Sequence, residues 1–147
     1  MILSFKSESE RGFLTNVEGK EPLRLKNSLS KNTENFTPTE LLVLSIGSCT
    51  SDDVLSILSK MKQTVNDYQC TLNAEREEEI PKTLKSVNIG YELTGDVSED
   101  AARKAVSLSL SKYCSVSILV RRGGAKVTYS LKINGKIIED HAQLRKE

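Results

Sequence analysis

Histidine is scarce in this sequence of 147 residues, and its charges are nearly balanced. Lysine and arginine total 21 against 20 acidic residues, a formal charge of +1. This balance gives no attraction for nucleic acid, an anionic membrane or a polyanionic substrate, so we expect no such partner. The single histidine, His141, falls in what reads as a polar C-terminal tail, and no two cysteines have metal-ligand spacing. We therefore expect neither a metal site nor a cysteine–histidine protease.

Long apolar segments are also missing. The longest one, around Leu41 to Ile46, is far shorter than the roughly 20 residues that span a bilayer. The N-terminus lacks the basic start and apolar core of a secretory signal. These absences predict a soluble, cytoplasmic protein. Because disulfides rarely persist in a reducing cytosol, any pair among the three cysteines that bonds is expected to be transient and chemical rather than architectural.

The chain is long enough to bury a core as a single domain, residues 1–147. Thr37-Pro38-Thr39-Glu40 has the N-cap threonine, first-turn proline and capping-box glutamate that begin a helix, and apolar spacings of three and four continue it to about Met61. Ser98 caps a second helix. Alternating or short apolar segments predict strands at residues 2–8, 13–17, 22–26, 68–74, 87–93 and 127–133. This order indicates the α+β class with antiparallel sheet.

Two cysteines have contexts that allow chemistry. Cys49 lies in the middle of the long helix, beyond the reach of the helix dipole, so a reactive thiolate there needs a cation from elsewhere. The candidate cations are Arg11, Arg24 and the pair Arg121-Arg122. Cys114 ends one helix just before a turn at residues 115–120, whose free N–H groups are expected to lower its pKa modestly. These contexts leave open which thiol attacks first.

Structural explanations compete with these roles. Free cysteines are usually buried and act as small hydrophobes, and Cys70 fits that description on the apolar face of its strand. Asp52 and Asp53 follow Cys49 at helix-neighbour spacing. A carboxylate raises the pKa of a nearby thiol, so these residues would serve by orienting the arginine, and a solvated polar stripe explains them better. For Glu40, the capping box is favoured over catalysis.

The chain resembles the OsmC/Ohr family. The resemblance rests on Thr37-Pro38-Thr39-Glu40-Leu41-Leu42 leading to Gly47-Ser48-Cys49-Thr50, and on Tyr113-Cys114-Ser115-Val116-Ser117 much later. It implies an intertwined α+β homodimer, with antiparallel sheets wrapped around two central helices. It also implies a thiol peroxidase of the oxidative stress response. Cys49 would attack an organic hydroperoxide, Cys114 would resolve the product as a disulfide, and a dithiol or lipoylated protein would reduce the pair. No metal, flavin or haem is required.

Three departures from the family pattern accompany this resemblance. The peroxidases have a glutamate ten residues before the first cysteine, where this chain has Thr39, and Glu40 points about 100° away from that position. Ser115 replaces the proline of the second motif. Arg11 matches the activating arginine of the family by position only.

Two function classes follow from the sequence. The first is the peroxidase, with Cys49, Cys114 and Arg11 catalytic and with a substrate pocket lined by Glu40, Leu42, Ile46, Asp53 and Leu110. The second is a dimeric protein that binds a small apolar ligand without turnover, which the absence of a glutamate at position 39 favours. A third possibility, that both cysteines are core residues, predicts slow alkylation of both thiols in the folded protein.

Overall fold

The computed structural model describes residues 1–31 and 34–144, which form two compact units, Met1–Leu42 and Val43–Glu147. Each unit is described by itself. The single-domain organisation remains a prediction, and residues 32–33 and 145–147 lie outside the described part.

The N-terminal unit is a small antiparallel sheet in the order β1 (Phe5–Ser7), β2 (Phe13–Thr15) and β3 (Arg24–Leu25). The strands predicted at residues 2–8 and 13–17 are confirmed, in shorter form, as the antiparallel pair β1 and β2, with a single 3-10 turn, η1 (Ser9–Arg11), between them. Among the described residues of this unit only Gly12 and Asn35 are buried. The sheet therefore has no hydrophobic core of its own.

The C-terminal unit is built on a sheet in the order β4 (Thr64–Arg76), β5 (Leu84–Asp96), β6 (Lys126–Ile133) and β7 (Lys136–Gln143). Two pairs are antiparallel, as predicted, but β5 and β6 are parallel because helices carry the chain back across the sheet between them. The predicted polar tail is wrong, since it forms β7. The signal for β7 was Asn134-Gly135, a two-residue hairpin turn with positive φ at both positions.

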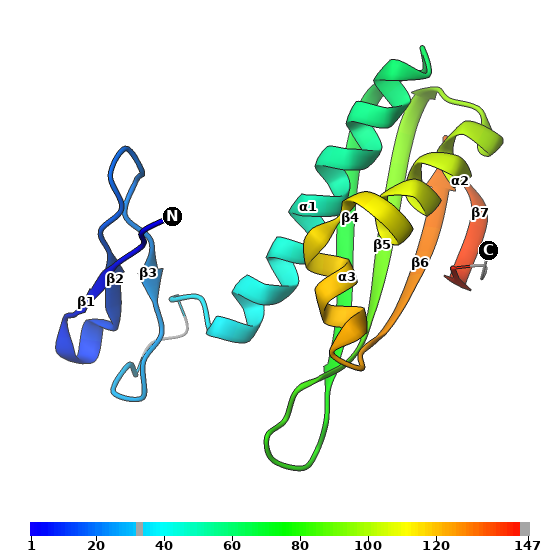
Figure 1. The fold of residues 1–147 in the computed structure, drawn as a ribbon. Coiled ribbons are helices and arrows are strands. Elements are labelled where there is room, and N and C mark those ends of the chain that lie inside the picture. Colours follow the sequence, from blue (N-terminus) through cyan, green and yellow to red (C-terminus); the bar gives the residue numbers. More distant parts are fainter. Residues whose placement is uncertain (32–33, 145–147) are drawn as a thin grey trace. The chain divides into compact units, whose positions relative to one another are not determined.

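Helices cover one face of this sheet (Figure 1). They are α1 (Pro38–Lys60), α2 (Glu99–Leu108), a π-helical turn η2 (Ser109–Tyr113) and α3 (Ser115–Arg122). Alternate residues of β5 point toward the helices and are fully buried, namely Val87, Ile89, Tyr91 and Leu93. Ile46, Val54 and Leu58 of α1 join the same core. Full burial of each such side chain stabilises the fold by roughly 1.5–3 kcal/mol.

The start of α1 follows the predicted capping box. The Glu40 backbone N–H donates to Thr37 Oγ1 at 3.2 Å, and the Thr37 N–H donates to Glu40 Oε2 at 2.7 Å. At Gly47 the helix passes so close to β4 that an added Cβ would lie 2.6 Å from Leu72 Cδ1. Gly47 thus allows close packing of the helix on the sheet.

By length and composition alone, α1 is also apolar enough to cross a membrane. Asp52 and Asp53 lie near its middle, where a bilayer would penalise charge. Its buried side chains pack in the core of the sheet unit. We therefore interpret α1 as the core helix of a soluble α+β fold.

Candidate functional site

The structure brings Cys49, Asp53 and Cys114 together. The two Sγ atoms and a carboxylate oxygen of Asp53 lie within 4.8 Å of one another. Both cysteines are free thiols, and Cys49 is half-buried whereas Cys114 is completely buried. A disulfide needs about 2.04 Å between sulfurs. The two sulfurs are therefore not bonded to each other, and Cys49 is the more accessible of the two residues.

The π-helical turn places Cys114. Its backbone N–H donates to the Ser109 carbonyl at 2.8 Å, a bond that spans five residues instead of the four of an α-helix. This wider turn brings Ser109 and Cys114 to the same side of the chain. Cys114 then caps α3, and its Sγ accepts from the Ser117 N–H at 3.4 Å.

Burial raises the pKa of the Cys114 thiol above its ordinary value. The hydroxyl and backbone N–H of Ser117 act in the opposite direction, and the neighbouring Cys49 raises the pKa further. The sequence predicted a modest lowering by free N–H groups. That prediction is wrong because desolvation of the thiolate outweighs the hydrogen bonds it receives.

A chain of hydroxyl groups joins the core to the thiol pair. Tyr91 and Thr50 hydroxyls are 2.6 Å apart, Thr50 and Ser109 hydroxyls are 2.8 Å apart, and Ser109 donates to Asp53 Oδ2 at 2.9 Å. Because a carboxylate only accepts, the donors run from Tyr91 through Thr50 and Ser109 to Asp53. Burial raises the pKa of Tyr91 well above its ordinary value, so it remains a donor.

This hydrogen-bonded chain changes the interpretation of Asp53. Asp52 is exposed, as a solvated stripe predicts, but Asp53 is half-buried and held by Ser109. Sequence reasoning also missed Thr50 and Ser109. Their only signal was a hydroxyl residue at a position that helical spacing assigns to the buried face.

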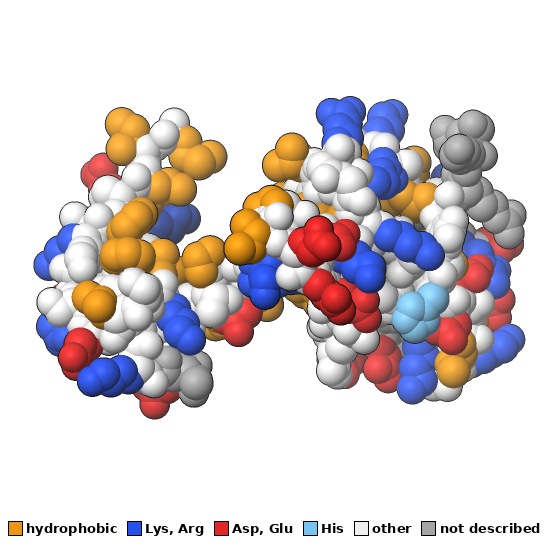
Figure 2. Space-filling model, turned by 90° about the horizontal axis from the view of Figure 1, so that it is seen from below, with side chains coloured by type: hydrophobic (Ala, Val, Ile, Leu, Met, Phe, Trp, Pro, Cys, Tyr) orange, Lys and Arg blue, Asp and Glu red, His pale blue; other side chains and the backbone are white. Residues whose placement is uncertain are grey.

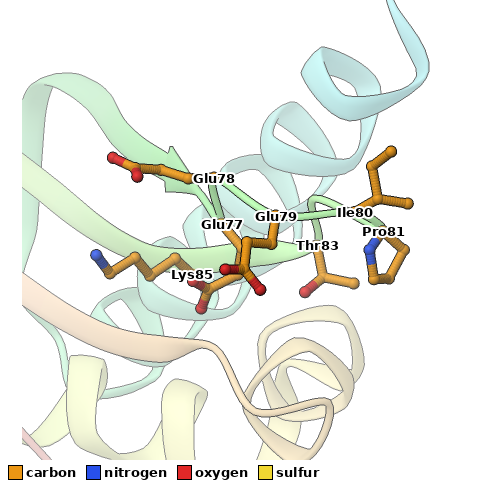
Figure 3. A pocket seen from close by; sticks show the side chains of 7 residues that line it. All are labelled: Glu77, Glu78, Glu79, Ile80, Pro81, Thr83 and Lys85. Atoms are coloured by element: carbon orange, nitrogen blue, oxygen red, sulfur yellow. The ribbon is translucent and has the colours of Figure 1, made fainter.

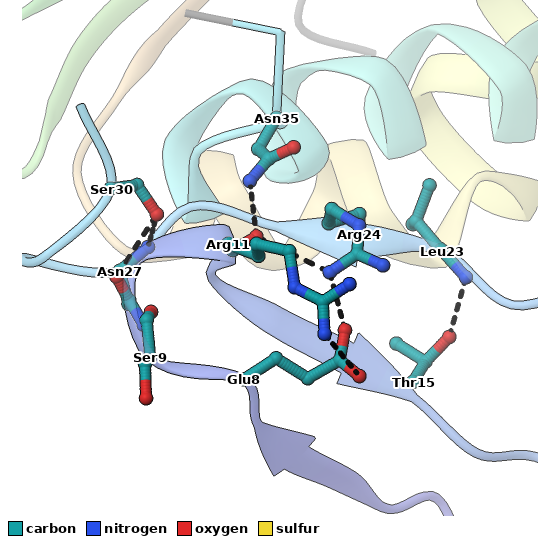
Figure 4. Close-up of polar contacts among 9 residues, drawn as sticks. All are labelled: Glu8, Ser9, Arg11, Thr15, Leu23, Arg24, Asn27, Ser30 and Asn35. Atoms are coloured by element: carbon teal, nitrogen blue, oxygen red, sulfur yellow. Dashed lines mark hydrogen bonds and ion pairs between the residues drawn. The ribbon is translucent and has the colours of Figure 1, made fainter. Parts of the chain in front are cut away.

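Arg11 belongs to the N-terminal unit (Figure 4). Its guanidinium lies 3.7 Å from the Glu8 carboxylate, and its side chain is 73% exposed. Glu8 also accepts from Arg24 at 2.6 Å, and this hydrogen bond lowers the pKa of Glu8. The Arg11 carbonyl accepts from Asn35 at 2.9 Å. These contacts hold the turn around Arg11, while its action on Cys49 remains a prediction.

The residues predicted to line a substrate pocket differ in burial. Ile46 and Leu110 are buried in the hydrophobic core, whereas Leu42 is 38% exposed. Glu40 is exposed, and hydrogen bonds from Thr37 lower its pKa. Its capping role is confirmed, and a pocket role for these residues remains a prediction.

The third cysteine, Cys70, lies on β4 and is not a member of the cluster of Cys49, Asp53 and Cys114. Cys70 is half-buried and packs against the core, as predicted. Burial raises the pKa of its thiol, although the hydroxyls of Ser51 and Tyr68 act against this. It provides a natural control thiol for experiments on the other two.

A hollow of 430 Å³ opens at the connection between β4 and β5 (Figure 3). Its lining is charged and exposed, and contains none of the cysteines: Glu77, Glu78, Glu79, Ile80, Pro81, Thr83 and Lys85. Exposed acidic side chains without buried polar partners do not make a ligand site. The chemistry of the described residues is concentrated at the thiol pair instead.

Comparisons with known proteins agree with this arrangement. A family model described as OsmC-like protein matches residues 30–130. Protein YhfA of Escherichia coli strain K12 is 36% identical over 98 residues, which are 66% of this chain and 72% of that protein. A hypothetical protein from Aquifex aeolicus VF5 has a solved structure with a TM-score of 0.76 and 34% identity, covering 90% of this chain and 96% of that one.

The fold extends to more distant structures. An organic hydroperoxide resistance protein OsmC from Legionella pneumophila, described as a predicted redox protein, gives a TM-score of 0.66 at 18% identity. The match covers 90% of this chain and 97% of that one. At this identity the likeness concerns the fold alone.

Proposed function

Because the chain belongs to the OsmC-like family, we propose that it is a two-cysteine thiol peroxidase that reduces organic hydroperoxides in the oxidative stress response. The observation that carries the proposal is the approach of the Cys49 and Cys114 sulfurs within 4.8 Å. Two thiols this close form a disulfide after modest side-chain rotation. The hydroperoxide resistance protein with the same fold supports the choice of substrate class.

The unequal burial of the two cysteines supports the proposed division of roles between them. Cys49 is half-buried and so the more accessible of the two to a peroxide, whereas Cys114 is fully buried. The Cys49 thiolate attacks the distal peroxide oxygen. An S–O bond forms, the O–O bond breaks, and the departing alkoxide takes a proton to become the alcohol. Cys49 is then a sulfenic acid.

Resolution follows between the same two side chains. The Cys114 sulfur attacks the Cys49 sulfur, an S–S bond forms, and hydroxide leaves with the proton of Cys114 as water. An external dithiol or lipoylated protein then reduces the disulfide by thiol exchange. Arg11 is proposed to stabilise the attacking thiolate, and Leu42 to favour an apolar peroxide.

The assembly is proposed to be a cytoplasmic homodimer. The N-terminal unit has exposed apolar side chains, including Phe5 at 60% exposure and Phe36 at 41%. Figure 2 shows hydrophobic side chains gathered on the surface of this unit. A three-stranded sheet without a core is not stable alone in water, and a second copy of the chain would cover it.

Steady-state reduction of cumene hydroperoxide with dithiothreitol tests the activity. We expect Cys49→Ser to lower the rate by at least about 100-fold, because the nucleophile is lost. Without dithiothreitol, Cys114→Ser is expected to consume one equivalent of peroxide and then accumulate a sulfenic acid. Cys70→Ser, a matched control outside the pair, should retain the wild-type rate.

Equal rates for the wild type and Cys49→Ser would remove the peroxidase proposal. The ligand-binding alternative depends on Thr39, which stands where the family's peroxidases have glutamate. An inactive wild type that gains peroxidase activity on Thr39→Glu substitution would favour that alternative.

A further inference from the structure

Two thiols and a carboxylate that converge within 4.8 Å also match the donor set of a metal ion. We propose that reduced Cys49, Asp53 and Cys114 bind one thiophilic divalent cation of the Zn²⁺ class, which competes with oxidation of the pair. The proposed metal binding is inferred from the geometry of the three donor atoms alone. Only the regulatory consequence rests on the proposed peroxidase function.

The spacing of the donors suits tetrahedral coordination. Zn–S bonds of about 2.3 Å and Zn–O bonds of about 2.0–2.2 Å place tetrahedral ligand atoms roughly 3.4–3.8 Å apart. The three donor atoms lie within 4.8 Å of one another before any ion draws them in. Side-chain rotations that move the donor atoms by about 1 Å therefore fill three coordination positions of the ion, and a water molecule fills the fourth.

Hydrogen bonds around the cluster already orient two of the three donors. Ser109 holds Asp53 by donating to Oδ2, and Thr50 fixes Ser109 in turn. The Ser117 N–H points at Cys114 Sγ. Such second-layer contacts fix the direction of metal ligands and strengthen binding. Cys49, which is half-buried, provides the entry path.

Binding and oxidation exclude each other chemically. When the ion binds, the two thiols release two protons, and the sulfur electron pairs that would attack a peroxide are shared with the metal. When the disulfide forms, the cluster loses two of its three donors. The ion would thus hold the enzyme in its reduced, inactive form until the ion is removed.

Titration with Cd²⁺ measures the binding, because thiolate ligands give an ultraviolet charge-transfer absorption that counts them. The probe is added to full-length, fully reduced protein freed of metal with a chelator. We expect one Cd²⁺ per chain with two thiolate ligands. Cys49→Ser and Cys114→Ser should each lose one thiolate and bind at least about 10-fold more weakly, and Asp53→Asn should bind about 10- to 100-fold more weakly.

Matched controls separate the cluster from adventitious binding. Cys70→Ser and Asp52→Asn should bind as the wild type does. Wild-type protein oxidised to the Cys49–Cys114 disulfide should bind no Cd²⁺, which tests the site without any substitution. Unchanged affinity in Cys49→Ser, or loss of the signal in Cys70→Ser, would overturn the inference.

The peroxidase function and the metal site can each be refuted without refuting the other. One equivalent of Zn²⁺ should slow oxidation of the reduced pair by cumene hydroperoxide, and chelator should restore the rate. Cd²⁺ binding without any peroxidase activity would refute the proposed function and retain the metal site. Peroxidase activity that is insensitive to stoichiometric Zn²⁺, together with no Cd²⁺ binding, would refute the metal site and retain the peroxidase.

Discussion

Thr50 links the core of the sheet unit to the surroundings of the thiol pair through hydrogen bonds. Its side chain is fully buried, and its hydroxyl is bonded both to Tyr91 and to Ser109. Ser109 in turn holds Asp53 beside the two sulfurs. The direction in which Asp53 points therefore depends on a hydroxyl in the neighbouring turn of its own helix.

A double-mutant cycle on Thr50 and Tyr91 tests this link. Thr50→Val leaves the buried Tyr91 hydroxyl without its hydrogen-bond partner, so the free energy of unfolding should fall by about 1–3 kcal/mol. Tyr91→Phe should cost about 1 kcal/mol, because Thr50 keeps Ser109 as its partner. The double variant has no Tyr91 hydroxyl left without a partner. Its loss in free energy of unfolding, measured by urea denaturation, should therefore be smaller than the sum of the losses in the two single variants. Strictly additive costs would contradict the hydrogen-bonded chain.

At the scale of elements, the π-helical turn between α2 and α3 decides where Cys114 lies. The bond from the Cys114 N–H to the Ser109 carbonyl closes five residues instead of four. Removing one residue from this turn would restore an α-helical register. Cys114 would then rotate away from Cys49 while α2 and α3 remain helical.

We accordingly predict that deletion of Ser111, an exposed residue of the turn, abolishes the disulfide although all three cysteines remain. Oxidation by cumene hydroperoxide should leave Cys114 as a thiol, measured by alkylation and peptide mapping. Circular dichroism and Ser111→Ala provide the controls for folding and for loss of the side chain alone. A deletion variant that forms the Cys49–Cys114 bond at the wild-type rate would show that the turn does not position it.

The elements themselves were largely predictable from the sequence, because caps and periodicity are local signals. Thr37-Pro38-Thr39-Glu40 gave the start of α1, and Ser98 gave the start of α2. The parallel pairing of β5 with β6 was not predictable, since it depends on the path of the helical crossover. The partners of Thr50 and Ser109 were hidden for a related reason. Helical spacing shows that a residue faces inward and does not show what it meets there.

The site was predictable only in part. Approach of Cys49 to Cys114 was expected from the family resemblance, because no local pattern joins residues so distant in sequence. The burial of Cys114 reversed the expected direction of its pKa. Asp53 was assigned to the pocket although its helical spacing favoured a solvated stripe, and in the structure one of its carboxylate oxygens lies close to the two sulfurs.

At the scale of the whole molecule, the described residues of the N-terminal unit form no hydrophobic core of their own, which is the basis for the proposed dimer. The unit's described side chains are exposed or half-buried except for Gly12 and Asn35. We predict that sedimentation or light scattering gives the mass of two chains. Because folding and association are then coupled, the unfolding midpoint should rise with protein concentration. A monomer with a midpoint independent of concentration would contradict the dimer.

The central claim is that Cys49 and Cys114 form one redox pair, and a single oxidation tests it most directly. Reduced protein is mixed with one equivalent of cumene hydroperoxide, and the remaining thiols are alkylated and mapped by mass spectrometry of peptides. The account predicts a disulfide between Cys49 and Cys114, with Cys70 the one cysteine still alkylated. Three alkylated cysteines after exposure to the peroxide, or a disulfide that includes Cys70, would contradict it.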